Sequence, residues 1–185
     1  MRRVSVIGNS GSGKTTLAAE LAAAMDVPHL ELDAIFHQHG WQPLPAREFQ
    51  AAVAAFTAGE AWVVDGNYSA VRDIVWRRAD TVVWLDPPRR RVMRQLVWRT
   101  VRRMAHRTTL WNGNRESWAN LLRADPQKSI IAWAWTHDRI YRERYLGAQA
   151  DPAHAHLEFI RLRTPAEIVL LARRAATATR PGGLG

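Results

Sequence analysis

The sequence predicts an α/β protein in which a parallel sheet lies between two layers of helices. Short apolar stretches that are typical of buried strands alternate with longer stretches of helix-forming residues. A glycine-rich loop at residues 8–15 joins the first predicted strand to the first predicted helix. The chain has 185 residues, of which 47% are hydrophobic, and this size and composition favour one domain with a full core.

The elements follow from local patterns in chain order. We expect strands at residues 3–7, 28–33, 61–65, 81–86 and 156–162. We expect helices at residues 16–25, 46–57, 70–78, 89–106, 116–123 and 127–146, and from Pro165 onward. Thr164 and Glu167 form a capping box around Pro165, which predicts the start of the last helix. The buried face of the long helix should carry Met93, Leu96, Val97, Val101 and Met104, which recur at helical spacing.

Composition excludes several classes of protein. The chain has no cysteine, so disulfide bonds and thiolate metal sites are excluded, and this fits a reducing compartment. It has no run of 18 apolar residues that would predict a membrane-spanning helix, and its first strand begins too early for a signal peptide. We therefore expect a cytoplasmic protein, with a single domain at residues 1–178 and a disordered tail at residues 179–185.

Residues 8–15 match the pattern G-x-x-x-x-G-K-[ST] of a phosphate-binding loop. Glycines allow backbone N–H groups to reach phosphate oxygens, and the helix N-terminus adds a partial positive charge. Lys14 should contact the β- and γ-phosphates, and the Thr15 hydroxyl should bind Mg²⁺. The alternative is a glycine-rich turn without a ligand. The predicted ATP-binding residues of this segment are Gly8, Asn9, Ser10, Gly11, Ser12, Gly13, Lys14, Thr15 and Thr16.

Acidic residues follow three predicted strands, at the edge where parallel sheets bind ligands. Asp65 and Asp86 each end an apolar strand and could hold Mg²⁺. We favour Asp65, because Gly66 would let a substrate approach the backbone, whereas Asp86 precedes two prolines and could be a structural cap. Asp33 could hold an acceptor hydroxyl, act as a base, contact Mg²⁺ or cap a helix. Trp41, in the next loop, is predicted to stack on the acceptor, and simple packing is the alternative.

Basic residues are concentrated in the second part of the chain. Residues 1–76 contain five Lys/Arg and eight Asp/Glu, whereas residues 77–185 contain 21 and nine, within a net charge of +9. Such a distribution attracts anions, which could be nucleotide phosphates or a nucleic-acid backbone. The alternative is that many of these arginines are solvated surface residues.

Three arginines are the predicted cations of phosphoryl transfer. They come from a larger group of candidates: Arg99, Arg102, Arg103 and Arg107 lie within about two turns, and Arg139 and Arg142 lie on a later predicted helix. Spacing of four places Arg99, Arg103 and Arg107 near one helix face. From this group we select Arg99, Arg103 and Arg139. Cations at these positions would neutralise the charge that develops on the transferred group. We expect a lid at about residues 99–126 that closes over the phosphates and brings arginines to them.

Several segments together resemble one known family. Residues 8–15, 32–33 with Trp41, 62–68, 79–86 and 110–116 resemble the adenylate-kinase-like P-loop proteins known as DNA topology modulation proteins. The resemblance extends to about residue 170. It implies a three-layer P-loop NTPase fold of the nucleoside monophosphate kinase type, with a five-stranded parallel sheet in the order 2-3-1-4-5 and a helical lid before the fifth strand. It also implies that the adenine of ATP lies near Arg163 and Pro165.

The acceptor side departs from the adenylate kinase pattern. Adenylate kinases carry an arginine and a proline directly after their Asp-Gly, whereas here Asn67 follows and the nearest arginine is Arg72. This difference argues against AMP as the acceptor. The predicted acceptor-binding residues are Asp33, Trp41, Gly66, Asn67 and Arg72.

The sequence therefore predicts ATP- and Mg²⁺-dependent phosphoryl transfer to a small-molecule acceptor, such as a nucleotide or a nucleoside. Lys14, Asp33 and the three arginines are the expected catalytic residues, and Thr15 and Asp65 are the expected Mg²⁺ ligands. One alternative is an ATP-binding regulator of DNA topology that binds nucleic acid through its arginine-rich C-terminal part, as the family's name implies. Another is an ATP-binding protein without turnover.

Overall fold

A five-stranded parallel sheet forms the centre of the protein. The structure, a computed structural model, describes residues 1–106, 109–114 and 130–179. The strands are β1 (Arg3–Gly8), β2 (His29–Glu31), β3 (Trp62–Asp65), β4 (Thr81–Leu85) and β5 (Glu158–Leu162). They are ordered β2-β3-β1-β4-β5, and every pair is parallel. This result confirms the predicted α/β class and the predicted order 2-3-1-4-5.

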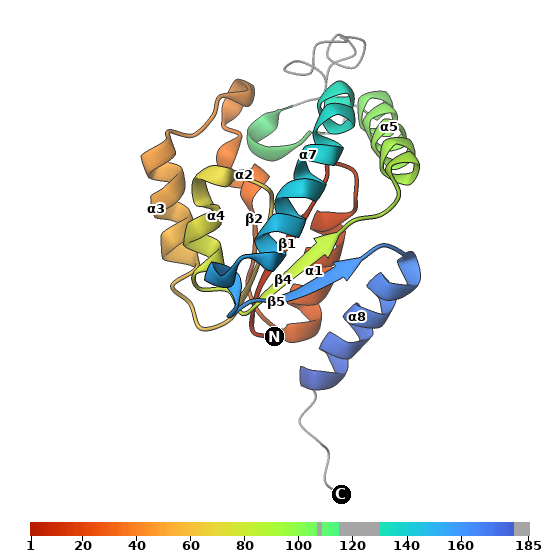
Figure 1. Cartoon of the computed structure of the whole chain (residues 1–185). Helices are drawn as coiled ribbons and strands as arrows, with labels where there is room; N and C mark the ends of the chain where they lie inside the picture. The colour runs from red at the N-terminus through yellow and green to blue at the C-terminus, as the bar shows by residue number, and fades with distance from the viewer. Residues whose placement is uncertain (107–108, 115–129, 180–185) are drawn as a thin grey trace, which may run out of the picture.

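Helices connect the strands and pack on both faces of the sheet (Figure 1). The α-helices are α1 (Lys14–Met25), α2 (Leu32–Phe36), α3 (Ala46–Phe56), α4 (Ser69–Trp76), α5 (Arg89–Ala105), α7 (Ile130–Ala150) and α8 (Pro165–Thr179). Three short 3-10 turns complete the described elements: η1 (His39–Trp41), η2 (Trp111–Gly113) and η3 (Pro152–His154).

Two apolar clusters hold the three layers together. Trp62 and Val64 of β3 belong to the cluster that α3, α4 and α7 cover. Val63, between them in the strand, belongs to the cluster that α1 and α8 cover. Successive side chains of a strand point to opposite faces, so a sheet that is covered on both sides needs continuous apolar strands. This requirement explains why the strands could be recognised as short apolar runs.

The start of the last helix has the predicted capping geometry. Glu167 Oε2 accepts hydrogen bonds from the backbone N–H groups of Arg163 at 2.6 Å and Thr164 at 2.9 Å. In return, the Glu167 backbone N–H donates to Thr164 Oγ1 at 3.3 Å. The box therefore fixes the point where the chain leaves β5 and enters α8.

Several boundaries differ from the predictions. β2 ends at Glu31, and Asp33 lies in the first turn of α2 rather than at the end of a strand. The reason is that Leu32, Ile35 and Phe36 recur at helical spacing and pack on the core, which favours a helical turn here. β5 begins at Glu158 instead of residue 156, α7 extends to Ala150 instead of residue 146, and Thr179 ends α8 instead of beginning a tail.

The buried face of α5 also differs from the predicted one. Its buried residues are Val92, Leu96, Thr100 and Met104. Val97, which was predicted to be buried, is 40% exposed. Val92 and Leu96 pack against the glycine-rich loop, and this contact sets the rotation of α5. Thr100 is polar and is nevertheless buried, because its position on α5 places it on the face that packs against the rest of the protein.

The predicted lid at about 99–126 lies only partly in the described structure. Residues 99–105 are the last turns of α5, and residues 110–114 form η2 and its flanks. Residues 107–108 and 115–129, with the helix predicted at 116–123, and residues 180–185 of the predicted tail, lie outside the described residues. In the described part of the chain, no helix is both long and apolar enough to cross a membrane.

Candidate active site

The glycine-rich loop lies between β1 and α1, at the carboxyl edge of the sheet (Figure 1). Gly11 and Gly13 have φ angles of +82° and +98°, which side chains other than glycine rarely adopt. The Ser12 N–H donates to the Asn9 carbonyl at 3.1 Å, and the Ser10 N–H donates to Asn9 Oδ1 at 2.8 Å. The loop is therefore a closed turn whose shape depends on glycines at fixed positions.

Two of these glycines are also required by close packing. A Cβ atom at Gly8 would lie 2.6 Å from the Leu85 carbonyl oxygen. A Cβ atom at Gly11 would lie 2.8 Å from Leu96 Cβ, on α5. Both distances are shorter than carbon atoms tolerate. β4 and α5 thus press directly on the loop and hold it in place.

Thr15 and Asp65 meet at the mouth of this loop. The Thr15 hydroxyl donates to Asp65 Oδ2 at 2.8 Å. His29 Nε2 lies 2.8 Å from the other oxygen of Asp65, which is 2% exposed. The two predicted Mg²⁺ ligands therefore come together, and His29, which the sequence analysis missed, orients the carboxylate.

A second carboxylate at this place was also missed. Glu31 Oε1 lies 3.3 Å from Thr15 Oγ1, and Glu31 Oε2 accepts a hydrogen bond from the Trp111 indole at 2.9 Å. Burial raises the pKa of Glu31, and the hydrogen bond from Trp111 opposes this shift. His29 and Glu31 alternate with Leu30 in β2, so the spacing of polar residues in this strand was the signal that could have shown them.

Lys14 lies among these acidic groups. Its ammonium group donates to the Asn9 carbonyl at 3.3 Å. Burial lowers the pKa of Lys14, the carboxylates of Asp33 and Asp65 raise it, and the guanidinium of Arg99 lowers it. Arg99, one of the predicted cations, therefore acts electrostatically on Lys14, together with the carboxylates of Asp33 and Asp65.

Asp33 belongs to a hydrogen-bonded group on the acceptor side. The Tyr68 hydroxyl donates to Asp33 Oδ1 at 2.6 Å, and His37 Nε2 lies 3.3 Å from the same hydroxyl. Burial and the neighbouring Asp33 raise the pKa of Tyr68, so this hydroxyl stays protonated. Burial lowers the pKa of His37, which favours the neutral ring. Asp33 is thus held by Tyr68 through one of its oxygens, and it does not cap α2, whose N-cap is Glu31.

Trp41, the predicted stacking residue, lies in an aromatic cluster with His37 and Trp111. Its ring contacts His37 edge-to-face, with centroids 5.2 Å apart, and Trp111 at 6.4 Å. Its backbone N–H donates to Asn114 Oδ1 at 3.0 Å, and the Asn114 amide donates to the Gln38 carbonyl at 2.8 Å. The segment around η2 is thereby fastened onto the loop after α2, and 37% of Trp41 stays exposed.

The structure gives two predicted acceptor residues another role. Gly66 is needed because a Cβ atom there, at a φ of +141°, would lie 2.8 Å from Leu32 Cβ. The Asn67 side chain binds the backbone of Gly8 through both its oxygen and its amide group. These contacts give Gly66 and Asn67 a supporting role at the start of α2 and at the phosphate loop, and their predicted contact with the acceptor stays a prediction.

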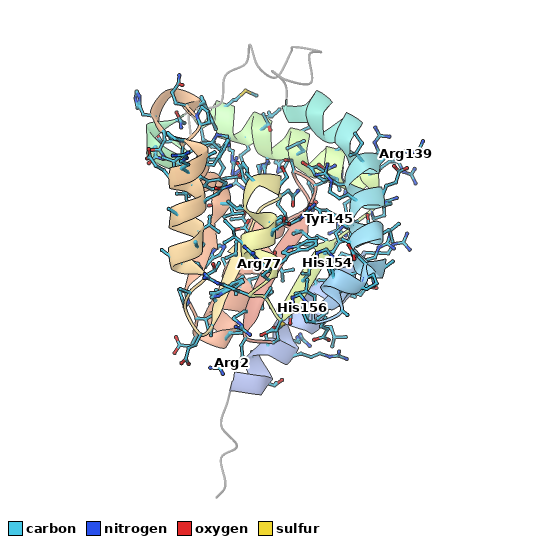
Figure 2. All side chains as sticks on the ribbon, turned by 60° about the vertical axis from the view of Figure 1, so that its left-hand side comes forward. Arg2, Arg77, Arg139, Tyr145, His154 and His156 are labelled. Carbon is cyan, nitrogen blue, oxygen red and sulfur yellow. The ribbon has the colours of Figure 1, made fainter. Side chains whose placement is uncertain are left out.

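The predicted arginines are distributed differently from the expectation. Arg99 and Arg103 are half-buried on α5, but the side chain of Arg139 is 88% exposed and pairs with Glu143 at 2.7 Å. Figure 2 shows Arg139 on the outer side of α7, directed away from the sheet. In this position Arg139 does not reach the phosphate loop, and its predicted role at the phosphates stays a prediction. Arg142, on the inner side, donates to Asp86 Oδ1 instead, at 2.7 Å.

Asp86 is therefore an ion-pair partner. It is 7% exposed, and Arg161 of β5 donates to its other oxygen, Oδ2. The structure thus brings Asp65, and not Asp86, to the Thr15 hydroxyl. Arg163 and Pro165, predicted near adenine, lie at the start of α8, beyond the carboxyl end of β5.

No protein-family model matches the chain, and no curated protein matches its sequence. Solved structures similar to it include a shikimate kinase from Acinetobacter baumannii in complex with shikimate, with 17% identity and a TM-score of 0.55, covering 100% of this chain and 96% of that chain. A gluconokinase from Sinorhizobium meliloti 1021 has 20% identity and a TM-score of 0.49, covering 96% and 92%. A sugar kinase from Janibacter sp. HTCC2649 has 18% identity and a TM-score of 0.48, covering 98% and 99%.

The likeness to the shikimate kinase covers the whole chain, including the five-stranded parallel sheet and its helices. The chain therefore has the fold of the P-loop kinases. The resemblance to DNA topology modulation proteins finds no support in these comparisons.

Proposed function

We propose that the protein is an ATP- and Mg²⁺-dependent kinase that transfers a phosphoryl group to a hydroxyl group of a small molecule. The observation that carries this proposal is the 2.8 Å hydrogen bond between Thr15 and Asp65, beside Lys14 at the mouth of the loop. Phosphoryl transfer needs bound phosphates, a positioned metal ion and cations that meet the developing charge. These three residues and the loop could supply each requirement.

The residues at this point suit the proposed ligands. Ser12 Oγ is buried inside the loop and has no hydrogen-bond partner among the described residues, as expected for a group that awaits a phosphate oxygen. The Thr15 hydroxyl and the Asp65 carboxylate are hard oxygen ligands, which Mg²⁺ prefers. Within the described ranges, no cluster of three His, Cys, Asp or Glu side chains could hold a metal ion alone. A site with these two protein oxygen ligands fits Mg²⁺, which takes oxygens of the bound phosphates as further ligands.

When bound, Mg²⁺ would neutralise charge on the phosphates during transfer. Thr15 and Asp65 would hold it, and the loop N–H groups would bind the phosphate oxygens. Lys14 and Arg99 would stabilise the negative charge on the transferred group. Asp33 would accept the proton of the acceptor hydroxyl, because Tyr68 occupies only one of its two oxygens. The similar shikimate kinase, whose structure holds shikimate, is consistent with a hydroxylated acceptor.

The alternative of a nucleic-acid-binding regulator has less support. Several arginines of the basic C-terminal part form ion pairs within the molecule: Arg142 and Arg161 bind Asp86, and Arg139 binds Glu143. These arginines are already partly neutralised, which reduces their attraction for a phosphate backbone.

The test is calorimetric binding of ATP to the full chain, with and without Mg²⁺. We expect Lys14→Ala to weaken ATP binding about tenfold or more, since it removes a charge-assisted hydrogen bond. Asp65→Asn should remove the gain in affinity that Mg²⁺ gives and should leave Mg²⁺-free binding nearly unchanged. Arg77→Gln, an exposed residue at the end of α4, is the matched charge control. Full ATP binding by Lys14→Ala would contradict the proposal.

A further inference from the structure

A small pocket lies between α4, α7 and the sheet. Its inner wall is aromatic and apolar, with Trp76 of α4 and Tyr145 of α7 on either side. Trp76 is 2% exposed and Tyr145 is 3% exposed. Figure 2 shows Tyr145 on the side of α7 that faces α4, opposite to Arg139. The pocket is therefore framed by rigid, well-packed side chains.

The charged residues of this pocket all have one sign. Arg72 of α4 and Arg144 of α7 line it, and none of the other described residues that line it is acidic. Burial and the neighbouring Tyr141 raise the pKa of Tyr145, whereas Arg144 and Arg72 lower it. Both arginines line the same pocket as this tyrosine, one from each helix.

Neither arginine is neutralised by a strong ion pair. Arg72 Nε lies 3.4 Å from Asp73 Oδ1, and that carboxylate is 76% exposed, so water screens the pair. The Arg144 guanidinium lies over the Tyr141 ring at 5.6 Å, and no ion pair in the described part of the chain involves Arg144. Two cations at one pocket repel each other, and an anionic ligand would remove this repulsion. A planar guanidinium group also matches carboxylate and phosphate oxygens in two parallel hydrogen bonds.

One end of the pocket lies beside residues that contact the phosphate loop and Asp33. Asn67 and Tyr68 line it at one end. Asn67 is bonded to Gly8 of the phosphate loop, and Tyr68 is bonded to Asp33. A small molecule in the pocket could therefore have one end at the arginines and a hydroxyl group near Asp33 and the loop.

We propose that the acceptor carries an anionic group, a carboxylate or a phosphate, and that Arg72 and Arg144 bind this group in the pocket between α4 and α7. This inference rests on the proposed kinase function and specifies its substrate class. The body of the acceptor packs against Trp76 and Tyr145, and its hydroxyl group faces Asp33. Arg72 belongs to the predicted acceptor-binding residues, and Arg144 is a new assignment.

The experiment is isothermal titration calorimetry on the full chain, with the phosphate loop saturated by Mg²⁺ and the non-hydrolysable ATP analogue AMP-PNP. Two sets of probes share a skeleton and differ in charge: glycerol, glycerate and glycerol 3-phosphate, and ribose, ribonate and ribose 5-phosphate. Each set distinguishes a carboxylate from a phosphate. The proteins compared are the wild type, Arg72→Gln, Arg144→Gln and the control Arg77→Gln, which removes the same charge outside the pocket.

We expect at least one anionic probe to bind about tenfold or more tightly than its neutral partner. Arg72→Gln and Arg144→Gln should each weaken that binding by about tenfold to a hundredfold, as loss of a charge-assisted hydrogen bond does, and Arg77→Gln should not. Equal binding of charged and neutral probes, binding of none of the anions, or equal effects of the three variants would overturn the proposal.

The same titrations separate this inference from the kinase proposal. Repeating them without nucleotide in Lys14→Ala shows whether an anion binds at the phosphate loop instead of the pocket. If AMP-PNP fails to bind while anions bind in an arginine-dependent way, the kinase proposal is wrong and the anion site stands. If AMP-PNP binds and neutral probes bind as well as anions, the anion site is wrong and the kinase proposal stands.

Discussion

Replacing Gly11 by alanine should destabilise the protein through two separate effects. The first is backbone strain, because Gly11 has a φ of +82°. The second is a steric clash, because the new Cβ atom would lie 2.8 Å from Leu96 Cβ and 3.0 Å from the Val92 carbonyl oxygen. Leu96 is fully buried, and the contact is with its Cβ atom, which cannot rotate away. The loop or α5 must therefore move.

The structure contains its own control for the size of this effect. Gly13 also has a positive φ, +98°, but nothing lies within 4 Å of a Cβ atom built there. Strain alone costs about 1–2 kcal/mol at such a position, so this is the expected effect of Gly13→Ala. Overpacking adds about 1–3 kcal/mol, so Gly11→Ala should lower the free energy of unfolding by about 2–5 kcal/mol.

Urea unfolding at pH 7, followed by tryptophan fluorescence, measures both variants against the wild type. ATP binding should also fall more in Gly11→Ala than the loss of folded protein explains, because the clash changes the shape of the loop. If Gly11→Ala and Gly13→Ala are equally stable, the contact between the loop and α5 is not as tight as described, and the reasoning is refuted.

Two further predictions concern contacts that fasten the sheet and the loop after α2. The carboxylate of Asp80 accepts hydrogen bonds from the backbone N–H groups of residues 2 and 3 and from the Thr81 hydroxyl. Burial raises the pKa of Asp80, but these hydrogen bonds outweigh burial and hold the pKa below its ordinary value of 3.8. The stabilisation from the ionised Asp80 is present above pH 3.8 and is lost as the pH falls through the lower pKa of the folded state. Asp80→Asn should therefore lower the free energy of unfolding by about 1–2 kcal/mol at pH 7, after allowance for solvent screening. In urea unfolding the variant and the wild type should become equally stable near pH 2, and a difference that stays constant with pH would contradict the assignment. Asn114→Ala leaves two partly buried backbone groups, the Trp41 N–H and the Gln38 carbonyl, without these partners and should cost about 1–3 kcal/mol in the same assay. An unchanged free energy of unfolding would mean that Asn114 does not fasten η2.

Much of the fold could be predicted because local patterns determine it. Apolar runs bounded by turns identified the strands, and the glycine-rich loop identified the first crossover. The meeting of Thr15 and Asp65 followed from topology, because the ends of parallel strands lie at one edge of the sheet. These predictions needed no knowledge of side-chain conformation.

Other site residues depend on contacts that no local pattern contains. The hydrogen bond from Trp111 to Glu31 joins residues 80 positions apart, and Tyr68 reaches Asp33 across 35 positions. The choice between Arg139 and Arg142 depends on the rotation of α7 about its axis. Arginines recur along that helix, so their spacing could not show which of them faces the sheet.

The fate of the γ-phosphoryl group of ATP tests the central proposal most directly. Phosphorus NMR would follow Mg²⁺-ATP with the full chain and a panel of hydroxylated acids, sugar phosphates, nucleosides and nucleotides. The proposed function predicts that ADP forms together with a phosphate ester of one acceptor class, and that Lys14→Ala abolishes this reaction. It would be contradicted if ATP stays intact with every acceptor, or if its γ-phosphate appears only as inorganic phosphate at a rate that Lys14→Ala does not change.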